Sequence, residues 1–224
     1  MRLATYAYSA GALLAGLVLG CSRTSAVTQT APAPDPPEQS DSAAIAKARA
    51  DSVRYPYTEA DVEFMSAMIG HHSQALLMAG WAPTHGAGSS VRTLAERIIN
   101  GQQDEIVTMQ RWLRDRGKPV PEPARMGQSG TGHHGHAAMP GMLTPDQLQQ
   151  LDQARGSEFD RRFLTFMIQH HKGAVAMVQK LFATPGAARD ETVFKFANDV
   201  SVDQRTEVAR MERMLAGMAP KAGS

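Results

Sequence analysis

Two pairs of adjacent histidines, each preceded by a methionine, carry the clearest chemical signal in this chain. Met68-Ile69-Gly70-His71-His72 recurs 99 positions later as Met167-Ile168-Gln169-His170-His171. An imidazole nitrogen suits zinc, copper, iron and nickel, whereas a thioether sulfur is a soft ligand that favours Cu(I). The repeated pattern therefore indicates metal chemistry, and copper fits this set of side chains best.

The repetition extends well beyond the histidines. Phe64 and Ala75 match Phe163 and Ala174 at the same offset, and a second block recurs at an offset of 102. One unit has thus been duplicated, and both copies keep the same polar positions. In the second block these positions are Gln102 and Glu105 in the first copy, and Gln204 and Glu207 in the other.

Other interpretations of these residues stay open. Methionine at helical spacing is usually core filler, and a buried histidine is often a satisfied polar group, as His72 would be if it bonded Glu105. A buried polar network is destabilising unless every member is paired, so its duplication favours a functional role for these residues over a purely structural role in the core. A di-iron bundle is disfavoured because no histidine has a glutamate three residues before it. Structural zinc is disfavoured because it usually recruits cysteine or more histidines than one helix offers here.

The elements that must position these residues are helices. Apolar residues recur with helical spacing in four long segments, and His71 and His72 lie in the middle of the apolar face of the first. Thr58 with Asp61 predicts a capping box at the start of that segment, and Thr144 followed by Pro145 predicts a further short helix. The four long segments are Thr58 to about Trp81, 90–116, 158–183 and 190–216.

Short connections within each copy require antiparallel hairpins, and a long connection between the copies lets one hairpin dock on the other. We therefore expect an all-α fold: a four-helix bundle built from two duplicated antiparallel helical hairpins. The expected domain spans 57–217, with repeat one at 57–117, a linker at 118–156 and repeat two at 157–217.

The linker between the copies is rich in glycine and proline and contains a second group of soft and imidazole ligands. Three histidines and two methionines fall within ten residues, which predicts an auxiliary copper-capturing segment. The alternative is a solvated loop whose histidine and methionine content is incidental. The linker candidates are His133, His134, His136, Met139 and Met142.

The amino terminus resembles a bacterial lipoprotein signal. Arg2 precedes an apolar stretch that ends in Val18-Leu19-Gly20-Cys21, and Cys21 is the only cysteine of the chain. We expect residues 1–20 to be a signal peptide, Cys21 to be lipidated, and residues 21–56 to be a mostly disordered tether. The protein would then be lipid-anchored in the bacterial cell envelope, facing the periplasm or the exterior, with no thiol left for a metal or a nucleophile.

The overall composition argues against nucleic acid as a partner. The 224 residues carry 23 basic and 22 acidic side chains, a formal net charge of +1, and no basic stripe indicates nucleic acid. The expected partners are a metal ion, a membrane through the lipid anchor, and a protein that donates or accepts copper.

The chain resembles the bacterial family catalogued as domain of unknown function 305. The resemblance rests on the Asp-x-x-Phe-x-x-x-Met-Ile-x-His-His-x-x-Ala-x-x-Met block and the Gln-x-x-Glu block in each half, over residues 57 to 216. It implies a ferritin-like bundle and, for some members, copper binding through histidine and methionine. The implied ligands are Met68, His71, His72, Met78, Met167, His170, His171 and Met177, supported by Gln102, Glu105, Gln204 and Glu207.

From the sequence we thus expect an envelope-anchored protein without enzymatic activity that sequesters or transfers copper, held as Cu(I), outside the cytoplasm. One rival is a ferritin-like metalloenzyme of oxidase type. The other is a metal-free helical interaction module.

Overall fold

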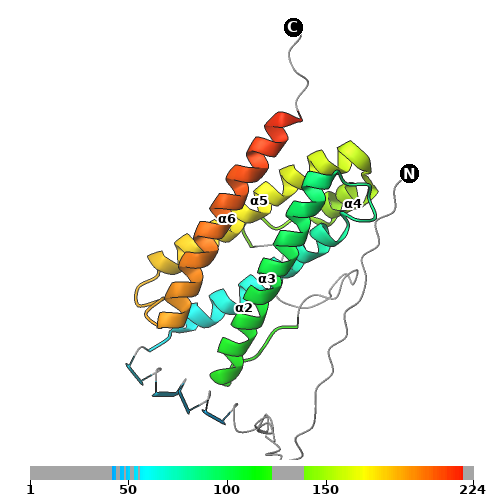
Figure 1. Ribbon diagram of the computed structural model, residues 1–224. Helices are drawn as coiled ribbons and strands as arrows, with labels where there is room; N and C mark the ends of the chain where they lie inside the picture. Colours follow the sequence, from blue (N-terminus) through cyan, green and yellow to red (C-terminus); the bar gives the residue numbers. More distant parts are fainter. Residues whose placement is uncertain are drawn as a thin grey trace, which may run out of the picture. The chain divides into compact units, whose positions relative to one another are not determined.

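The computed structural model describes residues 56–122 and 139–218, together with isolated helical positions between 42 and 54. Cys21 and the linker residues His133, His134 and His136 lie outside the described residues, as do the expected signal peptide and most of the tether. All regular structure in the described part of the chain is helical (Figure 1). The helices are α2 (Glu59–Gly80), α3 (Ser89–Asp115), α4 (Pro145–Gln153), α5 (Gly156–Ala183) and α6 (Glu191–Gly217).

The helix starts follow from side-chain caps that the sequence predicts. Thr58 and Asp61 form a capping box at α2, in which the Thr58 amide donates to the Asp61 carboxylate at 2.7 Å. Thr144 and Gln147 form the same motif at α4, with Pro145 in the first turn. These caps satisfy amide groups that a helix cannot pair internally, and they fix where α2 and α4 begin, whereas α3 and α5 have no side-chain cap.

The repeated aspartates also join the two hairpins to each other. Asp61 accepts a hydrogen bond from the Ala188 amide in the α5–α6 loop at 2.7 Å. Its equivalent, Asp160, accepts from the Gly88 amide just before α3 at 3.1 Å. Each copy therefore anchors the other copy's loop, which gives these aspartates a structural role.

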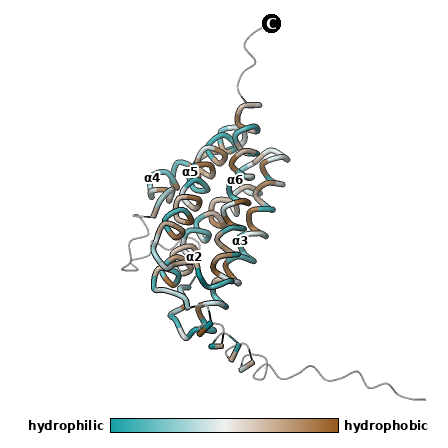
Figure 2. Tube along the Cα trace, turned by 90° about the vertical axis from the view of Figure 1, so that its left-hand side faces the viewer, coloured by the Kyte–Doolittle hydropathy of each residue, from teal (hydrophilic) through white to brown (hydrophobic). Residues whose placement is uncertain are grey.

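Helices α2 and α3 form one antiparallel hairpin and α5 and α6 form the other, and the hairpins pack together through α2 and α5 (Figure 1). The short helix α4 packs on α5. Figure 2 shows hydrophobic and hydrophilic residues on different sides of the helices, as amphipathic helices of a bundle require. None of the helices in the described residues is both long and apolar enough to span a membrane.

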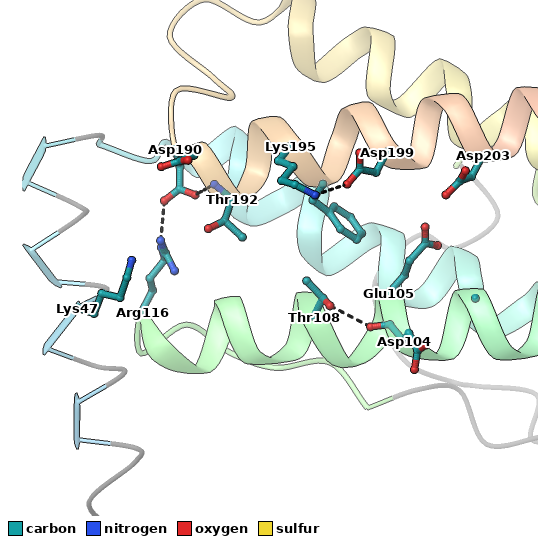
Figure 3. Close-up of a pocket in the computed structure, with 13 residues that line it drawn as sticks. Lys47, Asp104, Glu105, Thr108, Arg116, Asp190, Thr192, Lys195, Asp199 and Asp203 are labelled. Atoms are coloured by element: carbon teal, nitrogen blue, oxygen red, sulfur yellow. Dashed lines mark hydrogen bonds and ion pairs between the residues drawn. The ribbon is translucent and has the colours of Figure 1, made fainter.

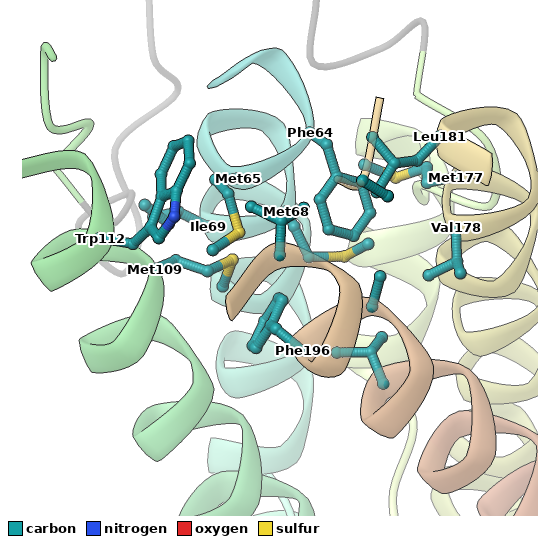
Figure 4. Packing of buried hydrophobic residues seen from close by; sticks show 14 of the residues in the cluster. Phe64, Met65, Met68, Ile69, Met109, Trp112, Met177, Val178, Leu181 and Phe196 are labelled. Carbon is teal, nitrogen blue, oxygen red and sulfur yellow. The ribbon is translucent and has the colours of Figure 1, made fainter. Parts of the chain in front are cut away.

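The buried apolar side chains fall into two clusters. Cluster one takes residues 62–69 of α2, 106–113 of α3, 174–181 of α5 and 193–200 of α6 (Figure 4). Cluster two takes the other half of each helix, and Leu151 of α4 adds to it. Between the clusters, every one of the four long helices has a short stretch that belongs to neither.

Candidate metal centre

The stretch between the two apolar clusters carries buried polar side chains on all four long helices, and we call these residues the polar layer. His71 and His170 are 0% exposed, and Gln102 and Gln204 are 3% and 2% exposed. In each long helix the apolar stripe is interrupted between cluster one and cluster two, and the polar layer lies at this interruption. The polar layer consists of His71, His72, Gln102, Glu105, His170, His171, Gln204 and Glu207.

The centre of the polar layer is a pair of stacked imidazoles from the two helices at the hairpin interface. The ring centroids of His71 in α2 and His170 in α5 are 3.8 Å apart, with an angle of 38° between the ring planes. His72 and His171 lie further out, at 6.4 Å and 6.3 Å from the rings of their neighbours in the chain. Two repeats that docked through equivalent helices have thus brought equivalent histidines together.

Burial keeps the central imidazoles neutral. Loss of solvation and, to a smaller extent, the neighbouring His72 lower the pKa of His71 to about 3, although its hydrogen bond to the Pro140 carbonyl acts in the opposite direction. The pKa of His170 is lowered well below its usual value, chiefly by burial and then by His71. A neutral imidazole keeps a lone pair on one ring nitrogen, and this is the form that binds metals.

Each outer histidine is held by a glutamate from the partner helix of its own hairpin. The Nε2 of His72 lies 2.6 Å from Oε2 of Glu105, and the Nε2 of His171 lies 2.6 Å from Oε2 of Glu207. Each carboxylate accepts a hydrogen bond from Nε2–H, and Nδ1 of each ring is left without a partner among the described residues. Carboxylates bound in this way orient metal-ligating histidines in many proteins, and they would equally satisfy a purely structural network.

The polar layer contains nearly all the unpaired buried groups of the described residues. Eight of the nine buried side-chain nitrogen and oxygen atoms that lack a protein partner belong to it. They include Nδ1 of all four histidines and both ring nitrogens of His170. Buried polar atoms in native proteins are rarely left without a partner, so these atoms need an explanation.

The repeated methionines flank the polar layer on both sides. Met68 and Met177 belong to cluster one, and Met78 and Met167 belong to cluster two. Each cluster thus holds one methionine of each repeat, and all four lie within the core. Within the described residues, no three histidine, cysteine, aspartate or glutamate side chains converge on a point that could hold a metal ion.

The end of the linker lies directly on the polar layer, and we call residues 139–143 the strap. The Pro140 carbonyl oxygen is 3.0 Å from Nε2 of His71, and the Gln74 side chain pairs with both backbone groups of Leu143. Met139 packs partly buried against cluster one, and Met142 is half-buried. These two linker methionines are thus attached to the bundle. The strap contacts were not predicted from the sequence, because they involve backbone atoms and residues that the repeats do not share.

On another side of the bundle, an acidic pocket of about 630 Å³ lies between α3 and α6. Its lining includes Glu105, Asp104, Asp199 and Asp203, and Figure 3 shows Glu105 and Asp203 pointing toward each other from the two helices. Partial burial raises the pKa of Asp203, and the carboxylates of Glu105, Glu207 and Asp199 raise it further. The sequence did not single out Asp203, because the equivalent residue in repeat one is Gly101.

One further buried histidine has a structural role. Nε2 of His85 lies 2.9 Å from the Asp152 carbonyl oxygen and 3.0 Å from its carboxylate, and Nδ1 lies 2.9 Å from the Thr84 hydroxyl. These bonds fasten the end of α4 to the α2–α3 loop. Both ring nitrogens are occupied, in contrast to the histidines of the polar layer.

A bundle of two like helical hairpins around a buried imidazole layer is a helical protein of the ferritin-like class. The chain belongs to the family described as Domain of unknown function (DUF305), whose model matches residues 61–215. The expected all-α, ferritin-like four-helix bundle and the expected family are therefore both confirmed. No curated protein sequence matches the chain significantly.

Solved structures of this family share the fold. A DUF305 fragment from Deinococcus radiodurans is 33% identical, with a TM-score of 0.59 over 72% of this chain and 98% of that one. A putative secreted DUF305 protein from Streptomyces coelicolor is 27% identical, with a TM-score of 0.59 over 74% and 97%. CopM in the Cu(I)-bound form is 28% identical, with a TM-score of 0.55 over 71% and 98%. CopM has also been solved in Cu(II)-bound and silver-bound forms.

Proposed function

We propose that this protein binds copper outside the cytoplasm through its polar layer, and that it sequesters or transfers the ion without catalytic turnover. The observation that carries the proposal is the set of eight unpaired atoms in the polar layer. Four imidazoles each have an Nδ1 that no group in the described part of the chain satisfies. A bound cation would supply the missing partner.

The chemistry of the donor set fits copper. The central imidazoles are neutral at physiological pH because their pKa values are lowered, so no proton has to leave before a metal binds. Thioethers lie on both sides of the layer, and imidazole together with thioether suits Cu(I) better than the harder divalent ions. The candidate imidazole ligands are His71, His72, His170 and His171, of which no three converge on one point, and the candidate soft ligands are Met68, Met78, Met167 and Met177.

The structural relatives support the same conclusion. CopM shares the fold and has been solved with Cu(I), Cu(II) and silver. Silver is a soft monovalent ion and resembles Cu(I) in its preference for sulfur. Together with the lone Cys21 behind an apolar segment, this favours copper handling at a membrane surface of the cell envelope, where a protein partner donates or accepts the ion.

A metal-free helical module is the second candidate, and one observation favours it. The His72–Glu105 and His171–Glu207 bonds at 2.6 Å are also what a purely structural buried network would contain. That candidate leaves the unpaired Nδ1 atoms without an explanation.

Metal content separates the two candidates. Untagged full-length protein is purified from copper-supplemented cells, washed with a weak chelator, and analysed by elemental mass spectrometry. Wild type should retain copper, and a variant with His71, His72, His170 and His171 all changed to Gln should retain none while keeping its helical circular dichroism.

His85→Gln is the matched control, because His85 is a buried histidine outside the polar layer. It should retain as much copper as wild type. A copper-free wild-type protein, or a folded four-histidine variant that still holds the ion, would refute the proposal.

A further inference from the structure

Within the described residues, the backbone of the strap lies between the His71 imidazole and solvent. Pro140 is exposed, whereas His71, to which its carbonyl oxygen bonds, is 0% exposed. The strap is therefore the local cover of His71, whose ring centroid lies 3.8 Å from that of His170.

Between its two ends, where Met139 packs against cluster one and Leu143 is buried in cluster two, the strap is held by a small number of polar contacts. From α2, Gln74 donates to the Leu143 carbonyl at 3.1 Å and accepts from the Leu143 amide at 2.8 Å. From α5, Gln169 donates to the Gly141 carbonyl at 3.4 Å. Segments held mainly by a few hydrogen bonds near the surface open at lower free energy than packed helices. The strap can therefore open while the bundle stays folded.

Two glycines allow the strap to lie this close to α5. Gly141 has a φ of 78°, and a Cβ at that position would lie 2.6 Å from the Gln169 carbonyl oxygen. A Cβ at Gly173 would overlap the Pro140 carbonyl and the Gly141 Cα. A methyl group at Gly173 must therefore displace the strap, while the helix itself accepts alanine readily.

We propose that the strap positions His71 and controls the access of Cu(I) to His71 and His170. A carbonyl oxygen has no proton to give, so Pro140 holds the proton of His71 on Nε2 and directs the lone pair to Nδ1. When the strap lifts, this restraint is lost and both imidazoles meet solvent. The identity of the ion rests on the proposed function, whereas the covering of the imidazoles does not.

The first test uses full-length, metal-free protein and diethyl pyrocarbonate, which modifies accessible neutral imidazoles. Gly173→Ala displaces the strap by bulk, and Gln74→Ala loosens it by removing two hydrogen bonds. Site-resolved mass spectrometry should show His71 and His170 reacting about tenfold faster in both variants, as expected when one or two net hydrogen bonds leave the closed state.

Gly101→Ala is the matched control, because Gly101 is also a mid-helix glycine and a Cβ there meets nothing within 4 Å. Its His71 and His170 should react as slowly as those of wild type. His72 and His171 serve as internal references, since general unfolding would expose all four histidines alike. Unchanged reactivity of His71 and His170 in both strap variants overturns the proposal.

The second test measures the transfer of bound Cu(I) to a chromogenic chelator. Both strap variants should release the ion about tenfold faster than wild type and Gly101→Ala, in proportion to the gain in imidazole exposure. If wild type fails to bind Cu(I) at all, the proposed function is refuted. The diethyl pyrocarbonate experiment would still test whether the strap covers the imidazoles. If the strap variants expose the imidazoles but release Cu(I) at the wild-type rate, the strap does not control access. The same conclusion follows if Asp203→Asn in the α3–α6 pocket changes the release rate and the strap variants do not.

Discussion

Two stacked neutral imidazoles in the core make the metal-free protein sensitive to acid. In the folded protein the pKa of His71 is lowered to about 3 and that of His170 is lowered well below its usual value, whereas both titrate near 6.5 once unfolded. Between these values the unfolded chain binds more protons than the folded one. The free energy of unfolding is therefore highest, as far as these two groups are concerned, above pH 6.5, and it falls as the pH drops toward 3.

We expect His71 to contribute a loss of about 1.4 kcal/mol per pH unit over this range, and His170 to add a loss of the same sign. Urea unfolding of apo-protein between pH 7 and pH 4 measures it. The variant His71→Gln/His170→Gln removes both groups and should show a flatter dependence than wild type. Equal slopes for the two proteins would mean that these histidines are protonated in the fold.

The two carboxylate–imidazole bonds give a second prediction at the scale of single residues. Glu105→Gln and Glu207→Gln keep the side-chain shape and remove the charge from a 2.6 Å bond. Each should lower the free energy of unfolding by about 1–2 kcal/mol and weaken copper binding about 10–100-fold. Urea unfolding and chelator competition provide the two measurements.

Glu212→Gln is the control for the glutamate variants. Glu212 pairs with Lys172 at 2.8 Å, but its side chain is 51% exposed. Its replacement should change stability by no more than about 0.5 kcal/mol and leave copper affinity unaltered. If all three variants behaved alike, the carboxylates of the polar layer would have no special role.

At the scale of elements, the helices present their candidate ligands on packed surfaces, whereas the glycine- and proline-rich sequence of the linker predicts that its ligands become ordered only on binding. Ordering costs about 1–2 kcal/mol for each fixed residue. We therefore expect the helical histidines to hold copper more tightly than His133, His134 and His136. Changing these three to Ala leaves the strap intact and should remove only weak copper equivalents in a chelator titration. If that variant lost the tightest copper-binding class, the linker rather than the bundle would supply the principal ligands.

The sequence predicts the elements well because their signals are local. Thr58 and Thr144 begin helices through caps encoded within three residues, and the apolar period marks each helix face. The His72–Glu105 bond was also foreseen as an alternative, since both residues lie in facing stripes. The strap could not be foreseen, because duplication draws attention only to positions where the copies agree. Gln74 and Gly173 are equivalent positions occupied by different residues.

At the scale of the whole molecule, two apolar clusters on both sides of the polar layer should fold the bundle without metal. Apo-protein should show strongly helical circular dichroism and a cooperative thermal transition, unlike a zinc finger. Copper should raise the midpoint in proportion to its occupancy, because it binds the native state. A chain that stays unfolded until copper is added would contradict this expectation.

The attachment of the molecule to a membrane is a separate prediction. If Cys21 carries a lipid, Cys21→Ser should move the protein from the membrane fraction to the soluble fraction. Its helical circular dichroism should be unchanged, because the bundle begins at Glu59, well after the cysteine. Equal retention of the variant in the membrane fraction would refute lipidation.

The strap has a consequence for how two copies of one unit share a single chain. A homodimer of separate hairpins would give identical surroundings to both sides of its twofold axis. In this fused chain the Pro140 carbonyl of the strap accepts a hydrogen bond from His71, whereas neither ring nitrogen of His170 has a hydrogen-bond partner among the described residues. Fusion has therefore made two symmetry-related imidazoles inequivalent. The two imidazoles would therefore bind metal ions with different affinities. In a symmetric dimer the two affinities would be equal until the symmetry is broken.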